Sequence, residues 1–390
     1  MHRVAHLLNT PLENHGGLNL LVREIAKGLS NDYTTFVFCP KQENNIIERD
    51  IPRLGYSRLS LSNTSSGKET LEYLKRMIHE HGIELIFFHG GDFSWGPDSG
   101  RISLINKIAK LGIKCVYVNH QSTPLFSRLP TLGQQGSISS IRSSIRFSLS
   151  WLLKCYQLSK TDVEITVSEF EETQSKRRYF PWKEKIVKIY HSRIPSSSRI
   201  KLRDTQKEKI ILSLGHFAYR KGQHVLIKAF GRIAAKYPLW KIRLVGSSGK
   251  SEYFYHLCDL IKKYDIQSQT ELITETAHPD RFFESASIYV QPSIVEAYGL
   301  ALQEAMFFGC ACIGSDSGGI RDSIENQNYL FPPDDEVALS IILERLVGNE
   351  SLIQQRQEIA LTDALKFNRN HDQMLSNYRY VIENCLKRNA

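Results

Sequence analysis

Short strand-like runs alternate with helical patterns along the whole chain, and this alternation constrains the fold more than any other feature. The helical patterns include Leu18–Ser30, Glu69–His81 and Arg101–Leu111. Strands that alternate with helices form parallel sheets with helices on both faces. The sequence therefore predicts an α/β fold of doubly wound, Rossmann-like sheets. The predicted strands are Arg3–Leu8, Thr35–Phe38, Ile83–Phe88, Lys114–Asn119, Val163–Val167, Ile186–Ile189, Ile210–Leu214, Lys241–Val245, Thr270–Ile273, Ile288–Gln291 and Ala311–Gly314.

The length of 390 residues favours two such domains, because a single hydrophobic core rarely serves so long a chain. The polar stretch "HSRIPSSSRIKLRDTQKEK", residues 191–209, predicts the linker between them. We expect an N-terminal domain over 1–195 and a C-terminal domain over 196–370, facing each other across a cleft. Ligands of such domains bind at the carboxyl ends of the strands, so this cleft is the expected site.

Residues 371–390 predict a last helix, because four apolar side chains recur at helical spacing. This pattern is compatible with packing on the N-terminal domain and equally with packing on the C-terminal one. The four residues are Leu375, Tyr378, Ile382 and Leu386.

The composition is that of a globular protein, with 41% hydrophobic and 23% charged residues, which excludes a disordered chain. Seven cysteines form an odd set without a Cys-x-x-Cys pair, which favours a reduced compartment. The N-terminus lacks a signal-peptide pattern, and no run approaches the roughly 20 apolar residues of a membrane span. We expect a cytoplasmic protein, either free or peripheral on the inner face of the cell membrane.

The positive charge is concentrated in the first half. Residues 1–198 carry 26 Lys and Arg against 18 Asp and Glu, whereas residues 199–390 carry 24 against 23. Such a surface attracts nucleic acid, anionic lipid or a phosphorylated substrate, or is simply well solvated. The stretch 137–156 places apolar residues on one helical face and Arg142, Arg146 and Lys154 elsewhere. It predicts either a membrane-surface helix that meets a lipid-linked acceptor or an ordinary core-facing helix.

Two carboxylates flank one helix start in "SIVEAYGLALQEA", residues 293–305. Gly299 opens the helix after a strand, so unpaired backbone N–H groups and the positive helix end form an anion site. Glu304, inside the helix, suits the hydroxyls of a ribose, and Glu296, on the loop before it, suits a sugar ring. The alternative is a capping carboxylate together with a solvated helix glutamate.

A second anion-suited element is "SLGHFAYRKGQHVLIKAF", residues 213–230. A strand ends at Gly215, and Arg220, Lys221 and Gly222 introduce the next helix. Cations at this place would neutralise charge that builds on a departing diphosphate, with Lys221 as the first candidate and Arg220 as the second. The alternative is a solvated basic helix start.

Together these stretches resemble the retaining glycosyltransferases of family 4, which have the GT-B fold. "EAYGLALQEA" is similar to the family signature Glu-x-Phe/Tyr-Gly-Leu-x-x-x-Glu-Ala, "GHFAYRKG" to its Gly-Arg-x-x-x-x-Lys-Gly segment, and "GCACIGSDSGGIRDSI" to the strand, loop and helix that follow. The resemblance implies that Glu296 holds the donor sugar, Glu304 the ribose and Lys221 the diphosphate. We expect Tyr298, Gly299 and Leu300, at the helix start, to line the same donor site.

The resemblance extends into the first domain. "NHGGLNLLVREIAKGL" is similar to the family's glycine-rich first loop, where Gly16 and Gly17 let the backbone approach the donor, as paired glycines can. His120, at a strand end, resembles a histidine near the reacting carbon of the donor, and His89 lines the same cleft in the family layout. The alternatives are a plain turn and structural histidines. The sequence departs from the family at His216, where arginine is usual, and in the stretches "YHSRIP" and "NQNYLF".

The function that the resemblance implies is transfer of a sugar from a nucleotide diphosphate sugar to an acceptor hydroxyl, with retention at the anomeric carbon. By analogy the acceptor is a polysaccharide or a lipid-linked sugar of the cell surface. No Asp-x-Asp motif follows a strand, so we expect neither a metal nor a further cofactor, and we expect no nucleic-acid partner. Two alternatives stay open: a nucleotide-sugar epimerase of the same fold, and a non-catalytic protein that binds anionic polymers.

Overall fold

A computed structural model describes residues 1–8, 17–40, 57–61, 67–89, 100–120, 151–192, 207–247, 251–274, 276 and 278–387. The chain divides into two compact units. The first unit comprises Met1–His191 together with Gln373–Ala390, and the second comprises Ser192–Asp372. The sequence predicted a first division after residue 195 and a second after residue 370.

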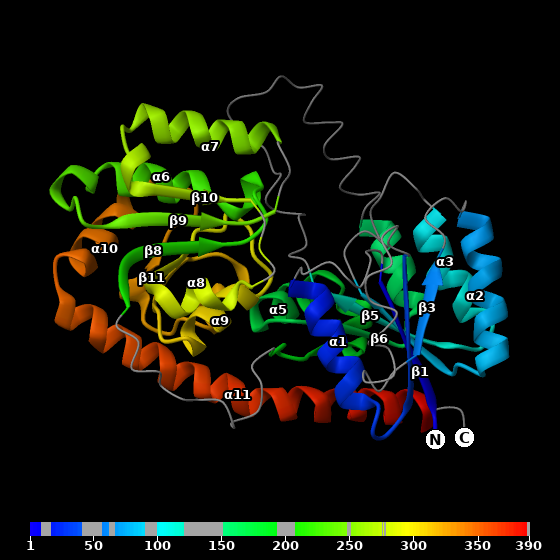
Figure 1. The fold of residues 1–390 in the computed structure, drawn as a ribbon. Coiled ribbons are helices and arrows are strands. Elements are labelled where there is room, and N and C mark those ends of the chain that lie inside the picture. The colour runs from blue at the N-terminus through cyan, green and yellow to red at the C-terminus, as the bar shows by residue number, and fades with distance from the viewer. Residues whose placement is uncertain are drawn as a thin grey trace. The chain divides into compact units, whose positions relative to one another are not determined.

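The first unit is built on a seven-stranded sheet in which every neighbouring pair is parallel. Its strand order is β3-β2-β1-β4-β5-β6-β7, so the order reverses between β1 and β4, as in doubly wound folds. Figure 1 labels β1, β3, β5 and β6 of this sheet. The strands are β1 (Arg3–Leu7), β2 (Thr34–Pro40), β3 (Ser57–Leu61), β4 (Leu85–His89), β5 (Lys114–Asn119), β6 (Val163–Thr166) and β7 (Ile186–Lys188).

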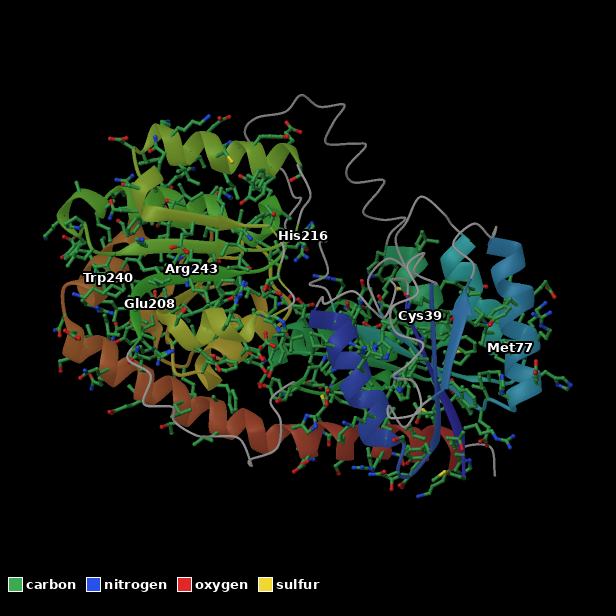
Figure 2. All side chains as sticks on the ribbon, viewed as in Figure 1. Cys39, Met77, Glu208, His216, Trp240 and Arg243 are labelled. Carbon is green, nitrogen blue, oxygen red and sulfur yellow. The ribbon has the colours of Figure 1, made fainter. Side chains whose placement is uncertain are left out.

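Helices pack against the sheet of the first unit. On one side of the sheet, its apolar side chains form a core with helices α2 and α3. Ala5, Phe36, Ile86 and Tyr117 of this side pack against α2 and α3 residues such as Leu74. Met77 of α2 and Cys39 of β2 are labelled in Figure 2. The helices are α1 (Gly17–Leu29), α2 (Gly67–His81), α3 (Gly100–Ala109), residues 151–160, α5 (Glu169–Arg178) and the 3-10 turn η3 (Phe180–Lys185).

The second unit has a six-stranded parallel sheet of order β10-β9-β8-β11-β12-β13, which reverses between β8 and β11. A single large apolar cluster, which includes Trp240 (Figure 2), joins this sheet to its helices. The strands are β8 (Glu208–Leu214), β9 (Lys241–Val245), β10 (Thr270–Ile273), β11 (Ala286–Gln291), β12 (Ala311–Ser315) and β13 (Leu330–Phe331). The helices are η4 (Tyr219–Lys221), α6 (Gln223–Gly231), η5 (Ala234–Lys236), α7 (Glu252–Lys263), η6 (Gln267–Gln269), α8 (Asp280–Ser285), α9 (Leu300–Phe307), η7 (Gly318–Asp322), η8 (Gln327–Tyr329), α10 (Glu336–Val347) and α11 (Glu350–Lys387).

The end of α11 packs within the first unit, which is one of the two packings that the sequence left open. Helix α11 continues from Glu350 to Lys387, and its residues from Gln373 onward belong to the first unit. The Arg379 guanidinium donates hydrogen bonds to the Asp32 carboxylate at 2.6 Å and to the Gly28 carbonyl at 3.2 Å. The Tyr378 side chain is fully buried there, with its hydroxyl 3.0 Å from the His191 ring.

The stretch 137–156 lies mostly outside the described residues, and only its end, from Trp151, can be followed. Leu152 and Tyr156 are exposed there. Lys154, in contrast, is buried, with its ammonium 2.6 Å from the Glu164 carboxylate and above the Tyr117 ring. Lys154 is therefore not part of a basic surface. In the described part of the chain, no helix has both the length and the apolar character that a membrane span requires.

Candidate functional site

The site in the second unit begins where β8 ends and the chain turns into η4. The turn carries Arg220 and Lys221 and closes on Gly222, whose φ of 67° lies in the left-handed region. A glycine suits that backbone conformation because it has no Cβ to clash. Helix α6 starts directly afterwards, so the two cations sit on a short, sharply bounded turn, as the sequence predicts.

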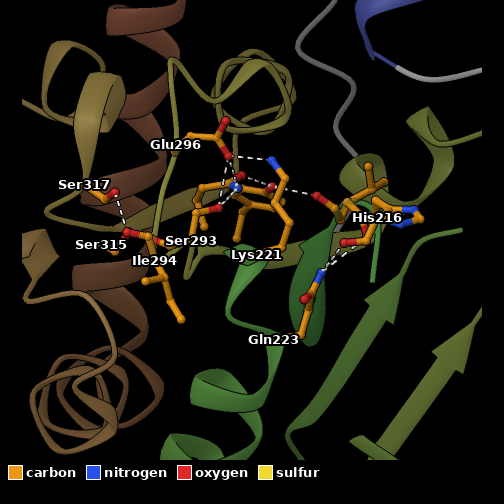
Figure 3. A network of polar contacts seen from close by, with 12 residues as sticks. His216, Lys221, Gln223, Ser293, Ile294, Glu296, Ser315 and Ser317 are labelled. Atoms are coloured by element: carbon orange, nitrogen blue, oxygen red, sulfur yellow. Dashed lines mark hydrogen bonds and ion pairs between the residues drawn. The ribbon is translucent and has the colours of Figure 1, made fainter. Parts of the chain in front are cut away.

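The loop that carries Glu296 follows β11 and is fixed on two sides. The backbone N–H groups of Ile294 and Val295 donate to the Arg220 carbonyl, at 2.8 and 3.3 Å. From the other side, the Ser317 hydroxyl donates to the Ile294 carbonyl at 2.9 Å, and the Ser315 hydroxyl donates to the carbonyl of Ser293, the residue before Ile294 (Figure 3). These bonds tie the loop to η4, to the end of β12 and to the segment that follows β12, so Glu296 has a defined position.

Lys221 and Glu296 form a direct ion pair at the centre of this arrangement. The Lys221 ammonium nitrogen lies 2.6 Å from Oε2 of Glu296, and both side chains are largely buried (Figure 3). Ser293 and Gln291 donate further hydrogen bonds to the same oxygen, at 3.0 and 3.3 Å. The sequence predicted separate ligand contacts for the two residues, and the structure adds a contact between them.

The electrostatics of the pair leave Glu296 ionised at neutral pH. Burial by itself would raise the pKa of its carboxyl, but the attraction of Lys221, and less strongly of Arg220, holds the pKa below its ordinary value. All three hydrogen bonds end on Oε2, and no described residue bonds Oε1. Glu296 can therefore accept a hydrogen bond from a ligand hydroxyl at Oε1 without losing its protein partners.

Helix α9 starts four residues after Glu296, and the first two backbone N–H groups of the helix have no hydrogen-bond acceptor among the described residues. Gly299 precedes the helix with a φ of 87° and has no side chain to cap it. No described group accepts from the N–H of Leu300 or Ala301. Such a helix start binds anions well, because two free donors add to the positive end of the helix dipole. Glu304 lies one turn further along and is half-buried, and Tyr298 is buried.

Replacing Gly222 by alanine is expected to destabilise the second unit and to displace Lys221. A Cβ at Gly222 would lie 1.9 Å from the carbonyl oxygen of Pro292. Gly309→Ala is a matched control, since Gly309 also has a φ of 67° but its Cβ would meet nothing closer than 3.9 Å. Backbone strain should cost both variants about 1–2 kcal/mol, and the clash should cost Gly222→Ala roughly 1–3 kcal/mol more. Thermal unfolding measures the difference, and equal losses would contradict the role given to Pro292.

His216, the departure from the family pattern, lies on the same side of the second unit. Its Nδ1 is 3.4 Å from the Ser247 hydroxyl, and its carbonyl accepts from the Gln223 amide at 3.1 Å (Figure 3). Burial and the neighbouring Arg220 lower the pKa of His216 below its ordinary value. The ring is therefore neutral near pH 7 and does not replace the fixed charge of an arginine.

The predicted residues of the first unit are partly outside the described residues. Gly16 lies outside them, and Gly17 is the first residue of α1. His89 ends β4 and His120 directly follows β5, and the two rings are joined by a hydrogen bond of 2.9 Å between Nδ1 of His89 and Nε2 of His120. Burial lowers the pKa of His120 to about 3 and that of His89 well below its ordinary value. Both rings are neutral at physiological pH.

Sequence reasoning missed the partners that hold these residues in place. Gln291 and Ser293 were not singled out, although two polar residues at a strand end directly before a motif glutamate were a readable signal. His6 was missed as well, because a single histidine within an apolar strand carries no signal by itself. Among the described residues, no group of three or more His, Cys, Asp or Glu side chains is placed to hold a metal ion.

Two family models match the chain, one in each half. Residues 15–192 match the model described as Glycosyltransferase Family 4, and residues 196–361 match the model described as Glycosyl transferases group 1. An uncharacterized glycosyltransferase of Haemophilus influenzae is 29% identical over 215 residues. That match covers 53% of this chain and 57% of the relative, so it spans little more than half of the relative's length.

Solved structures of similar fold cover nearly the whole chain. A sucrose-phosphate synthase from Thermosynechococcus elongatus aligns with a TM-score of 0.74 at 19% identity, over 98% of this chain and 100% of the other. The Anabaena protein HepE, in complex with UDP-glucose, aligns with a TM-score of 0.70 at 17% identity, over 97% and 100%. At such identities the likeness shows the fold alone, and that fold is the two-domain α/β fold of the GT-B type.

The two family matches together run from residue 15 to residue 361, and both models describe glycosyltransferases. The chain therefore belongs to the glycosyltransferases, with a Family 4 domain in its first half and a group 1 domain in its second.

Proposed function

We propose that the protein transfers a hexose or related sugar from a nucleotide diphosphate sugar to an acceptor hydroxyl, with retention of the anomeric configuration. The observation that carries this proposal is the buried Lys221–Glu296 pair directly before the uncapped start of α9. A cation, two free N–H groups and an open carboxylate oxygen match the diphosphate and the sugar hydroxyls of such a donor. The HepE structure holds a molecule of this class, UDP-glucose.

In the proposed reaction the second unit stabilises the leaving group. Lys221 has three N–H donors and uses one on Glu296, so the others can bind phosphate oxygens as the bond to the sugar breaks. Arg220 and the first turn of α9 would add to this stabilisation. Glu296 would hold the sugar through Oε1, and Glu304 the ribose. The departing phosphate would accept the proton of the acceptor hydroxyl.

The proposal extends to cofactor, acceptor and setting. Since Lys221 and Arg220 can supply positive charge at the diphosphate, we propose that the reaction needs no metal ion. The acceptor would be a polysaccharide or a lipid-linked sugar, in the cytoplasm or at the inner face of the cell membrane. This part rests on the family resemblance and on the excess of basic residues in the first half of the sequence.

A thermal-shift panel tests donor binding before any acceptor is known. Nucleoside diphosphates and their sugars are expected to raise the melting temperature, because a ligand that binds only the folded state stabilises it. At a concentration of about 100 Kd the gain is about 2.7 kcal/mol, or roughly 5–10 °C for a unit of this size. Nucleoside monophosphates, which lack the second phosphate, should shift the melting temperature less. The absence of a shift with every diphosphate in the panel would contradict the proposed donor class.

A further inference from the structure

Three histidines of the first unit form a continuous hydrogen-bonded line across three neighbouring strands. Nδ1 of His6 lies 2.8 Å from Nε2 of His89, and Nδ1 of His89 lies 2.9 Å from Nε2 of His120. Successive rings are stacked, with centroids 5.1 and 5.2 Å apart. The line joins β1, β4 and the residue after β5, which are adjacent in the sheet.

The parallel register explains why the three rings share one face of the sheet. His6 pairs with Phe87, and His89 lies two residues beyond Phe87. His89 in turn pairs with Val118, and His120 lies two residues beyond Val118. Residues two apart on a strand point to the same face, so each step stays on that face and moves toward the carboxyl end. The line therefore ends with His120 at the edge of the sheet where doubly wound folds bind ligands.

A second support holds the His120 ring from another direction. The ring of His191 stands 5.0 Å from that of His120, and Nε2 of His191 is 3.0 Å from the Tyr378 hydroxyl of α11. His191 and Tyr378 are both buried. The His120 ring is thus in contact with two side chains, His89 and His191, each of which has a further hydrogen-bond partner.

The hydrogen-bonding needs of His6 give the line a direction. Burial lowers the pKa of His6 to about 3, and His89 and His120 are neutral as well, so each ring carries one N–H. Nε2 of His6 is buried and has no hydrogen-bond partner among the described residues. A proton there would be a buried donor without an acceptor, which native structures avoid most strictly. The proton of His6 therefore belongs on Nδ1, and each ring donates from Nδ1 to Nε2 of the next.

We propose that His6 and His89 are positioning residues that hold His120 in its Nδ1–H tautomer, so that His120 offers a neutral N–H donor at the carboxyl edge of the first sheet. The partner of that donor would be an oxygen of the sugar or of the acceptor, and this last step rests on the proposed function. The tautomer itself depends only on the line of histidines.

Long-range proton–nitrogen NMR of protein labelled with ¹⁵N-histidine tests the tautomer directly near pH 7.5. His120, assigned through its substitution by glutamine, is expected to carry its proton on Nδ1. In His6→Leu, which removes the first donor, the signals of His89 and His120 should change to a mixture of tautomers. His6→Asn keeps an amide donor close to the position of Nδ1 and should preserve the wild-type pattern. A wild-type His120 protonated on Nε2, or a His120 signal unchanged in His6→Leu, would overturn the proposal.

Steady-state kinetics provide a second test. A purely structural role of His6 would not produce the combination of changes in kcat and KM that we expect. For His6→Leu we expect kcat to fall roughly tenfold, the equivalent of about one hydrogen bond, with the KM of the donor nearly unchanged. His6→Asn should recover most of the loss, and a variant without that recovery would count against the proposal. The proposed function fails separately, because it requires nucleotide-sugar binding by the wild type, whereas the tautomer is measured without any ligand.

Discussion

Replacing Lys221 by alanine is expected to reduce the rate of sugar transfer by about 10²–10³-fold, the usual loss for one group that stabilises developing charge. The variant loses the cation that faces the leaving diphosphate, and it also leaves the buried Glu296 carboxylate without its counter-ion. Release of the nucleoside diphosphate from the donor measures the rate, with water as the acceptor of the sugar while the natural acceptor is unknown. A rate within a factor of two of the wild type would contradict the role of Lys221.

A matched control separates the site from ion pairs in general. Lys236 and Glu344 also form a pair with a nitrogen–oxygen distance of 2.6 Å, but Lys236 is 66% exposed. An exposed pair contributes little to stability, so Lys236→Ala should leave both the rate and the melting temperature almost unchanged.

A double variant separates catalysis from folding. Breaking a buried pair from one side costs about 3–5 kcal/mol, whereas neutral residues of similar size at both positions are tolerated far better. Lys221→Met combined with Glu296→Gln should therefore recover much of the stability lost in Lys221→Ala, but none of the rate. Recovery of both would mean that the pair acts only as a structural element.

The parts of the fold that could be predicted are those with strong local patterns. Buried parallel strands such as β4 and β11 consist mostly of apolar residues, and their predicted bounds agree with the structure within two residues. Strand β3 (Ser57–Leu61) was missed, because "SRLSL" has only two apolar residues among serines and an arginine. β3 is an edge strand and pairs with a single neighbour, β2. An edge strand needs fewer apolar and β-branched residues than a central strand, so its sequence pattern is weak.

The candidate site could be predicted residue by residue, but not as an arrangement. The motif around Glu296 and the turn around Lys221 are each readable, since glycines and charges at strand ends have local causes. Their contact at 2.6 Å joins positions 75 residues apart and follows from the order of β8 and β11 in the sheet. The line from His6 to His120 was hidden for the same reason, because it depends on register between strands, which a single sequence does not reveal.

Lowering the pH from 7.5 to 5.5 is expected to destabilise the first unit strongly. His6, His89 and His191 are almost fully buried and His120 is half-buried, and burial lowers the pKa of each of these four rings below its ordinary value, to about 3 for His6 and His120. In the unfolded chain these rings bind protons below about pH 6.5. The unfolded state therefore binds more protons than the native state in acid, and stability that is present above pH 6.5 is lost as the pH falls toward 3.

The size of this loss follows from the number of rings. Each histidine with a lowered pKa costs about 1.4 kcal/mol for every pH unit below 6.5, so the four of them together cost on the order of 6 kcal/mol at pH 5.5. That is a large share of the roughly 5–15 kcal/mol by which a domain is stable. No described carboxylate forms an ion pair with any of these rings, and their neighbours are one another, Phe87 and the Tyr378 hydroxyl.

Hydrogen exchange at pH 7.5, 6.5 and 5.5, corrected for the intrinsic pH dependence of exchange, resolves the effect by unit. Peptides that cover β1, β4 and β5 should lose protection below pH 6.5, while those of β9 and β11 in the second unit should change less. His6→Leu removes one of the four titrating rings, so its loss of stability per pH unit should be smaller by about a quarter of the wild-type value. Protection of β1 and β4 that stays constant down to pH 5.5 would show that the rings already accept protons in the folded state below pH 6.5, which would contradict their lowered pKa values.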